Sequence, residues 1–155
     1  MKTPHEFKVM RVRECVSPSA LIDTPEQAVA YWRANLPAAD WYDPSKEMFV
    51  VLALNTRRRL IGHNLVTIGT LDTCTVHPRE VFKPAIAVSG SAILLAHNHP
   101  SGDPTPSEAD IKVTRDLIRA GQLLKIEVID HVIVGAATPA SRDYVSLREL
   151  GFFAV

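Results

Sequence analysis

The sequence has 155 residues, of which 46% are hydrophobic and 22% are charged, and its 17 Lys and Arg residues balance 17 Asp and Glu residues. This length and composition fit one globular domain that needs no disulfide to fold. A formal net charge of zero gives no general electrostatic reason for tight nonspecific binding to nucleic acid.

The first half of the sequence predicts one helix and two strands. Residues 6–13 alternate apolar and polar side chains and could form a short strand. The stretch Asp23-Thr24-Pro25-Glu26 is typical of a helix start, and Pro37 ends this helix. Residues 37–46 have loop composition. The apolar run 48–54 predicts a strand buried on both faces, and residues 60–69 predict its hairpin partner.

The second half alternates between helices and strands. We expect a helix from about His77 to Gly90, a strand over 92–96, a third helix from Ser107 to Gly121, and a strand over 126–134. Residues 144–147 fit either a last strand or a short helix. This order predicts an α/β fold with one central sheet, but it does not give the strand order.

Nothing in the sequence predicts export or insertion into a membrane. The N-terminus lacks an apolar core of signal-peptide length, and no apolar run approaches ~20 residues. The isolated Cys15 and Cys74 form no CxxC motif and fit a reducing compartment. We therefore expect a cytoplasmic protein.

The stretch HNHPSGDPTPSEAD, residues 97–110, predicts a metal site. Alternate residues of a strand point to the same face, so His97 and His99 direct two imidazoles to one place. Asp110 falls in the first turn of the following helix, next to the strand end. Two imidazoles and one carboxylate are the protein ligands of many catalytic zinc sites. The other histidines, namely His5, His63, His77 and His131, are interpreted as structural or exposed, and His131 is of most interest because it follows Asp130.

A water molecule activated by a metal needs a general base. The candidates are Glu47, Glu80, Asp103 and Glu108, and spacing alone does not choose between them. Glu108 stands close to Asp110 in the same helix and would point away from it, because successive helical residues are rotated by about 100°. Glu47 stands just before a buried strand, which could bring its carboxylate into a pocket.

The motif resembles that of the JAMM (MPN+) metalloproteases, in which H-x-H is followed by seven residues and S-x-x-D. Here it consists of His97, His99, Ser107 and Asp110. The wider stretch AHNHPSGDPTPSEADI, with VHPREVFKPAI before it and DHVIVG after it, is similar to the RadC-like subfamily. The likeness extends over about residues 47–150.

This resemblance implies a cytidine-deaminase-like α/β/α sandwich around a mixed sheet. It further implies that His97, His99 and Asp110 bind one Zn²⁺ ion and that Ser107 hydrogen-bonds the tetrahedral intermediate. Glu47 in KEMFVVLAL would pass a proton from water to the leaving amine. Residues 1–46 would be an N-terminal extension with one helix packed on the same domain, 47–150 the JAMM domain, and 151–155 a tail.

Two departures from the family pattern are visible. Asn98 replaces the Ser or Thr that proteolytic JAMM members usually carry between the histidines, although RadC-like members share the Asn. About forty residues precede the first buried strand, too few for the helix-hairpin-helix region that RadC proteins usually carry.

Three functions are compatible with the sequence. We favour a zinc-dependent hydrolase acting on a peptide or isopeptide amide. A DNA-associated accessory protein, acting as a nuclease or by binding, is the alternative, for which the basic triplet at residues 57–59 is the local support. The third is a metal-stabilised interaction module without turnover. The substrate, the metal present in the cell and the oligomeric state are not given by the sequence.

Overall fold

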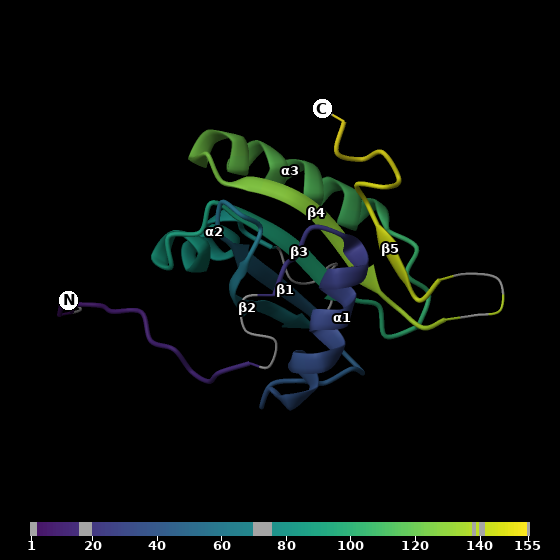
Figure 1. Cartoon of the computed structure of the whole chain (residues 1–155), viewed down its shortest axis with the longest axis horizontal. Coiled ribbons are helices and arrows are strands. Elements are labelled where there is room, and N and C mark those ends of the chain that lie inside the picture. The colour runs from purple at the N-terminus through teal and green to yellow at the C-terminus, as the bar shows by residue number, and fades with distance from the viewer. Residues whose placement is uncertain (1–2, 16–19, 70–75, 138, 140–141, 155) are drawn as a thin grey trace.

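The computed structural model describes residues 3–15, 20–69, 76–137, 139 and 142–154. Within these residues the chain forms three α-helices, a short 3₁₀ helix and five strands (Figure 1). The helices are α1 (Pro25–Asn35), η1 (Leu36–Ala38), α2 (Pro78–Ala87) and α3 (Glu108–Leu124). The strands are β1 (Glu47–Leu54), β2 (Leu60–Gly69), β3 (Ala92–Asn98), β4 (Glu127–Val134) and β5 (Tyr144–Ser146).

The strands form one mixed sheet in the order β2-β1-β3-β4-β5. β1 runs antiparallel to both β2 and β3, whereas β3 and β4 are parallel and are connected through α3. β5 pairs antiparallel with β4, so the last apolar stretch is a strand and not a helix. The sheet therefore brings the end of β3 beside the start of β1 and close to the start of α3.

Helices cover both faces of the sheet, as the resemblance implied. In β1, Met48, Val50 and Leu52 pack in the core on the α1 side. Phe49 and Val51 pack in the second core, below α2 and α3. Figure 1 shows α1 across one face and the other two helices on the opposite side. The α/β/α sandwich explains why β1 is a continuous apolar run, since neither of its faces reaches water.

Helix α1 begins where the sequence predicts it. The Thr24 side chain accepts a hydrogen bond from the Gln27 N–H, and the Gln27 side chain accepts one from the Thr24 N–H. This capping box, with Pro25 in the first turn, fixes the start of the helix. α1 then packs against β4 and β5, which attaches this part of the N-terminal region to the sheet.

Two predicted elements differ in the structure. Residues 3–15 contain no strand, and Phe7 and Val12 are 88% and 96% exposed, so the prediction of a strand over 6–13 is wrong. Apolar alternation does not hold a strand that has no pairing partner. Helix α3 continues beyond Gly121 to Leu124, and its C-cap residue Lys125 adopts the left-handed conformation with φ 60°. Gly121 is instead a site of close packing, because a Cβ there would lie 2.4 Å from the Ile126 carbonyl oxygen.

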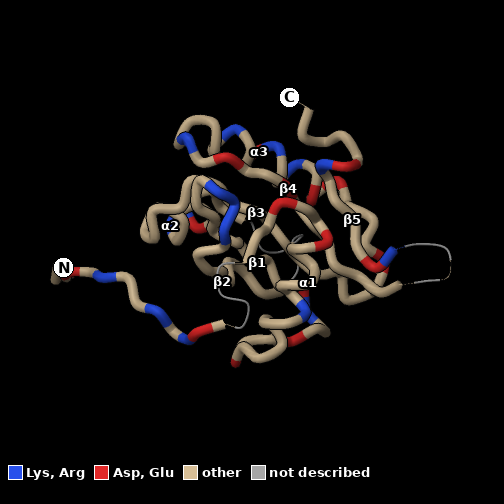
Figure 2. The backbone as a smooth tube through the Cα atoms, viewed as in Figure 1, with Lys and Arg blue, Asp and Glu red and all other residues tan. Residues whose placement is uncertain are grey.

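Positively and negatively charged residues are interspersed along the described part of the chain (Figure 2). None of the helices in the described ranges combines the length and apolarity needed to cross a membrane. Cys15 is a free, half-buried thiol, and Cys74 lies outside the described residues.

Candidate metal centre

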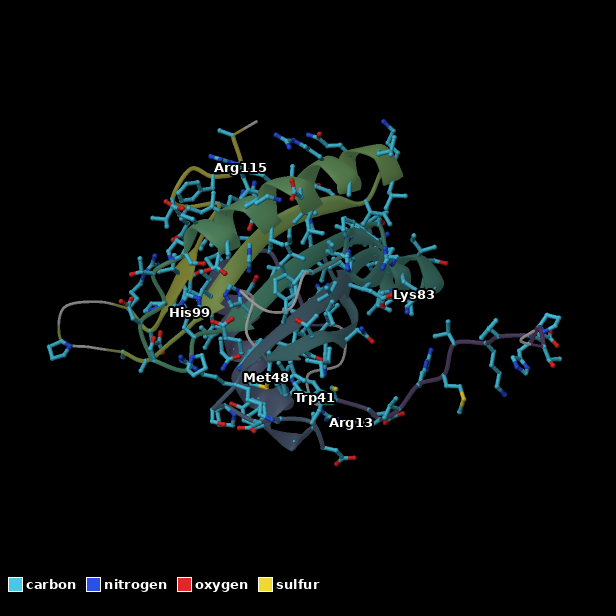
Figure 3. All side chains as sticks on the ribbon, turned by 180° about the vertical axis from the view of Figure 1, so that it is seen from behind. Arg13, Trp41, Met48, Lys83, His99 and Arg115 are labelled. Carbon is cyan, nitrogen blue, oxygen red and sulfur yellow. The ribbon has the colours of Figure 1, made fainter. Side chains whose placement is uncertain are left out.

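Three predicted ligands come together where β3 ends and α3 begins. His97 lies on β3, His99 directly follows that strand, and Asp110 is in the first turn of α3. In the view from behind, His99 lies beside the start of α3 (Figure 3). His97 and Asp110 are almost fully buried, whereas the His99 side chain is 12% exposed. The centre therefore has one side that water can reach.

The cap of α3 orients the Asp110 carboxylate. Ser107 is the N-cap residue, and its Oγ accepts the Asp110 N–H at 3.1 Å. In return, Asp110 Oδ2 accepts the Ser107 N–H at 2.8 Å. This reciprocal pair is a capping box with Asp in the third helical position. A local helix-start signal thus also holds the carboxylate towards the histidines.

The three side chains direct their acceptor atoms at one point. His97 Nε2 lies 3.1 Å from His99 Nε2 and 3.2 Å from Asp110 Oδ1. His99 Nε2 lies 3.2 Å from Asp110 Oδ2. Ligands about 2.0–2.1 Å from a tetrahedral zinc ion lie about 3.3 Å from one another, so the observed spacing fits such an ion.

The hydrogen bonds around the centre leave lone pairs, and no donors, facing its middle, which favours a bound cation. His99 Nδ1 lies 2.8 Å from the Asp103 carbonyl oxygen, which can only accept, so Nδ1 carries the proton of the neutral ring. His99 Nε2 then presents a lone pair to the centre. Asp110 Oδ1 is buried and receives no hydrogen bond. Three converging lone-pair donors repel one another unless a positive charge lies among them.

The pKa of His99 reflects this demand for positive charge. Burial lowers the pKa, but the hydrogen bonds to Asp110 and Asp103 and the charges of Asp110 and Glu47 outweigh it, so the pKa of His99 is raised. A proton on His99 is the simplest cation that the centre can take up. A divalent ion would replace this proton and engage all three side chains, which is how metal binding at histidine sites releases protons.

Glu47 lies on the face of the sheet that carries His97. Phe49 pairs with His97 across β1 and β3, so Glu47, two residues earlier, is level with His99 in the antiparallel ladder. Glu47 and Phe49 project to the same face of the sheet. The Phe49 ring stacks on His97 with 5.8 Å between centroids. Glu47 is half-buried and close enough for its charge to act on His99.

The other candidate bases have different surroundings. Glu80 is on α2, where its carboxylate pairs with Lys83 at 3.0 Å. Asp103 is exposed, and its Oδ1 accepts hydrogen bonds from the backbone and hydroxyl of Thr105. Glu108 is exposed on the first turn of α3. Of the four candidates, Glu47 alone starts the strand that pairs with the strand carrying His97.

His131, which the sequence left as structural or exposed and as the histidine of most interest, lies directly behind His97. It is fully buried, its Nε2 lies 2.7 Å from His97 Nδ1, and its Nδ1 lies 2.6 Å from Thr114 Oγ1. Burial and the neighbouring His97 hold the pKa of His131 well below its usual range. A histidine within an apolar strand was the available signal, but its neighbour could not be named without the pairing of β3 and β4.

Comparison with known proteins identifies the family. The family described as RadC-like JAB domain matches residues 22–152. The chain belongs to the RadC-like JAB domain family. The family match begins well before residue 47, and the predicted boundaries at 47 and 150 stay predictions.

Curated relatives carry names without a stated activity. The UPF0758 protein of Caldanaerobacter subterraneus subsp. tengcongensis is 50% identical over 132 residues, which cover 85% of this chain and 52% of the relative. The UPF0758 protein YsxA of Bacillus subtilis is 46% identical over 119 residues, covering 77% of this chain and 49% of YsxA. A UPF0758 protein of Methanosarcina barkeri is 44% identical over 110 residues, covering 71% and 46%. This chain spans about half the length of such relatives.

Proposed function

We propose that this chain is a metal-dependent hydrolase that cleaves an amide bond in a peptide or isopeptide substrate. The observation that carries the proposal is the convergence of His97, His99 and Asp110 on one point at spacings of 3.1–3.2 Å. A zinc ion held there would supply Lewis acidity, which polarises a carbonyl group and lowers the pKa of water to ~7. Two imidazoles and a carboxylate also suit ferrous iron, so the ion itself is part of the proposal.

Glu47 is proposed as the general base and acid. The strand register that sets Glu47 level with His99 supports this role, because His99 is the ligand that water can reach. There it would take a proton from the attacking water and deliver it to the leaving nitrogen. General acid–base catalysis of this kind contributes about 100- to 10,000-fold to a rate.

Ser107 is proposed to stabilise the developing negative charge on the substrate oxygen. Its Oγ accepts the Asp110 N–H, which orients the hydroxyl beside the ligand. A hydroxyl has one proton to donate. Because Ser107 Oγ is the acceptor in its bond with the Asp110 N–H, the Ser107 proton is available for another partner. A donor already held in place stabilises a transition state without reorganisation.

The alternative of a DNA-associated protein receives no support from the placement of the basic triplet. Residues 57–59 lie in the turn after β1, at the opposite end of that strand from Glu47. Eight residues of strand separate the two ends, which is roughly 26 Å. Arg58 is also paired with Glu127 at 2.7 Å. We accordingly retain the hydrolase as the proposed function and propose that it acts in the cytoplasm.

Hydrolysis in water enriched in oxygen-18 tests the proposal. Zinc-loaded protein would be incubated with a proteome-derived peptide library and with isopeptide-linked peptides, and the products analysed by mass spectrometry. The proposal expects new carboxyl groups carrying the label, and their loss in Glu47→Gln or after chelation. Labelled products that are equally abundant with Glu47→Gln would contradict the assigned mechanism, and no labelled product from any class of peptide would contradict the activity.

A further inference from the structure

The inner nitrogen of His97 is part of a buried chain of hydrogen bonds. His97 Nδ1 lies 2.7 Å from His131 Nε2 on the parallel neighbour β4. His131 Nδ1 lies 2.6 Å from Thr114 Oγ1 on α3. Thr114 Oγ1 in turn lies 2.6 Å from the carbonyl oxygen of Asp110. His97, His131 and Thr114 are each 0% exposed, so no water competes for these contacts.

The position of every proton in this chain follows from its last member. A carbonyl oxygen only accepts, so the single hydroxyl proton of Thr114 is donated to Asp110. Thr114 Oγ1 must then accept from His131, which places the proton of that neutral imidazole on Nδ1. His131 Nε2 is left as an acceptor.

The same assignment of donors and acceptors gives the tautomer of His97. Because His131 Nε2 can only accept, the proton of His97 lies on Nδ1 and its Nε2 carries a lone pair. This Nε2 is the atom that faces His99 and Asp110. The absence of a hydrogen bond to the buried Asp110 Oδ1, which is 3.2 Å away, agrees with an unprotonated His97 Nε2.

We propose that Thr114 and His131 are positioning residues that keep His97 in its metal-binding tautomer. The hydrogen-bonded chain from the Asp110 carbonyl oxygen through Thr114 and His131 to His97 is called the relay below. The inference rests on the metal centre of the proposed function and deepens it. The relay links two ligands, since it begins at the main chain of Asp110 and ends at the ring of His97. Outer hydrogen bonds of this kind typically change metal affinity by about 10- to 100-fold.

Substitutions at Thr114 separate the relay from packing. Thr114→Val keeps the shape but removes the acceptor, so His131 can move its proton to Nε2 and force the His97 proton onto the atom that faces the metal. Thr114→Ser keeps the hydroxyl and is the matched control. Affinities for Zn²⁺ and Co²⁺ would be measured by competition with a chromophoric chelator. We expect binding about 10- to 100-fold weaker for Thr114→Val and within about threefold of the wild type for Thr114→Ser.

Nitrogen-15 NMR of the histidine rings gives a second measurement that does not depend on a variant. Long-range proton–nitrogen correlations in the metal-free wild-type protein are expected to show His97 protonated at Nδ1. A His97 ring protonated at Nε2 alone would overturn the relay even if Thr114→Val does not fold. Equal metal affinity of the wild type and Thr114→Val would overturn it as well. If the wild type itself bound neither ion, both the relay and the proposed function would fail, whereas the preceding outcomes leave the proposed function intact.

Discussion

Asn98 holds the backbone on both sides of Glu47. Its side-chain oxygen accepts the Met48 N–H at 2.8 Å, and its side-chain nitrogen donates to the Lys46 carbonyl oxygen at 2.9 Å. Asn98 is 8% exposed and lies between the two histidines of the motif. Asn98 makes this pair of bonds with two separate atoms, whereas a Ser or Thr at this position has a shorter polar group with one oxygen. The departure from the proteolytic JAMM pattern thus has a structural role in placing Glu47.

Replacement of Asn98 by Ala tests how much its two hydrogen bonds to Met48 and Lys46, here called the clamp, stabilise the fold. Two backbone groups lose their partner near a buried strand, which is expected to lower the free energy of unfolding by about 1–3 kcal/mol. Urea denaturation would measure it. Asn64→Ala is the control, since that exposed side chain bonds only to the adjacent Leu65 carbonyl among the described contacts, and we expect a change within about 0.5 kcal/mol. Equal stability of the two variants would refute the clamp.

Glu47→Gln should separate metal binding from turnover. The carboxamide keeps the size of the side chain but cannot take up a proton, so we expect unchanged zinc content and hydrolysis about 100- to 10,000-fold slower. Zinc content and the rate on any substrate found by the oxygen-18 assay would be measured together. Glu108→Gln, an exposed position two residues before Asp110, is the matched control and should retain activity. The opposite pattern would assign the base to Glu108.

The proposed general base could not be chosen from the residues alone. The convergence of the three candidate ligands could be predicted, because strand alternation and a helix cap are local features of residues 97–110. The choice of Glu47 over Glu80 and Glu108 from the residues alone could not be made, because it depends on the pairing of β1 with β3. The family resemblance indicated Glu47, and the register agrees with that choice.

The remaining discrepancies also concern contacts between distant segments. The contacts of His131 with His97 and Thr114 depend on β4 lying next to β3 and on α3 packing against β4. The prediction of a strand over residues 6–13 was wrong for a related reason. Apolar alternation indicates an extended segment, but it does not show whether another strand is available to pair with it.

Asp110→Asn should remove the stabilisation that zinc gives to the fold. The wild-type carboxylate meets two imidazole nitrogens, and a bound cation would relieve their mutual repulsion, so zinc is expected to raise the melting temperature of the wild type. In Asp110→Asn the charge that would hold the cation is lost, so we expect no shift of the melting temperature with zinc. Calorimetry with and without zinc checks this, and an undiminished zinc shift would count against Asp110 as a ligand.

His63 should make the stability depend on pH. Burial, with a smaller contribution from the charge of Arg13, lowers the pKa of His63 from 6.5 to about 4, and its Nδ1 lies 2.7 Å from the Tyr31 hydroxyl. Between pH 4 and 6.5 the unfolded chain therefore binds more protons at this residue than the folded chain. The part of the free energy of unfolding that depends on neutral His63 is therefore fully present above pH 6.5 and is lost as the pH falls towards 4.

His63→Gln, which keeps a polar partner for Tyr31, should have a shallower loss of unfolding free energy over that pH interval. Comparing the variant with the wild type isolates His63 from the other buried groups, such as His131. Denaturation at several pH values gives the two slopes, and parallel slopes would exclude His63 as the source.

Metal content tests the central claim most directly. Freshly purified wild-type protein and the His97→Ala, His99→Ala double variant would be compared by elemental analysis after equal exposure to a trace of zinc, iron and cobalt. The account predicts about one divalent ion per wild-type chain and close to none in the double variant. A wild-type protein without bound metal, or equal metal in both proteins, would contradict it.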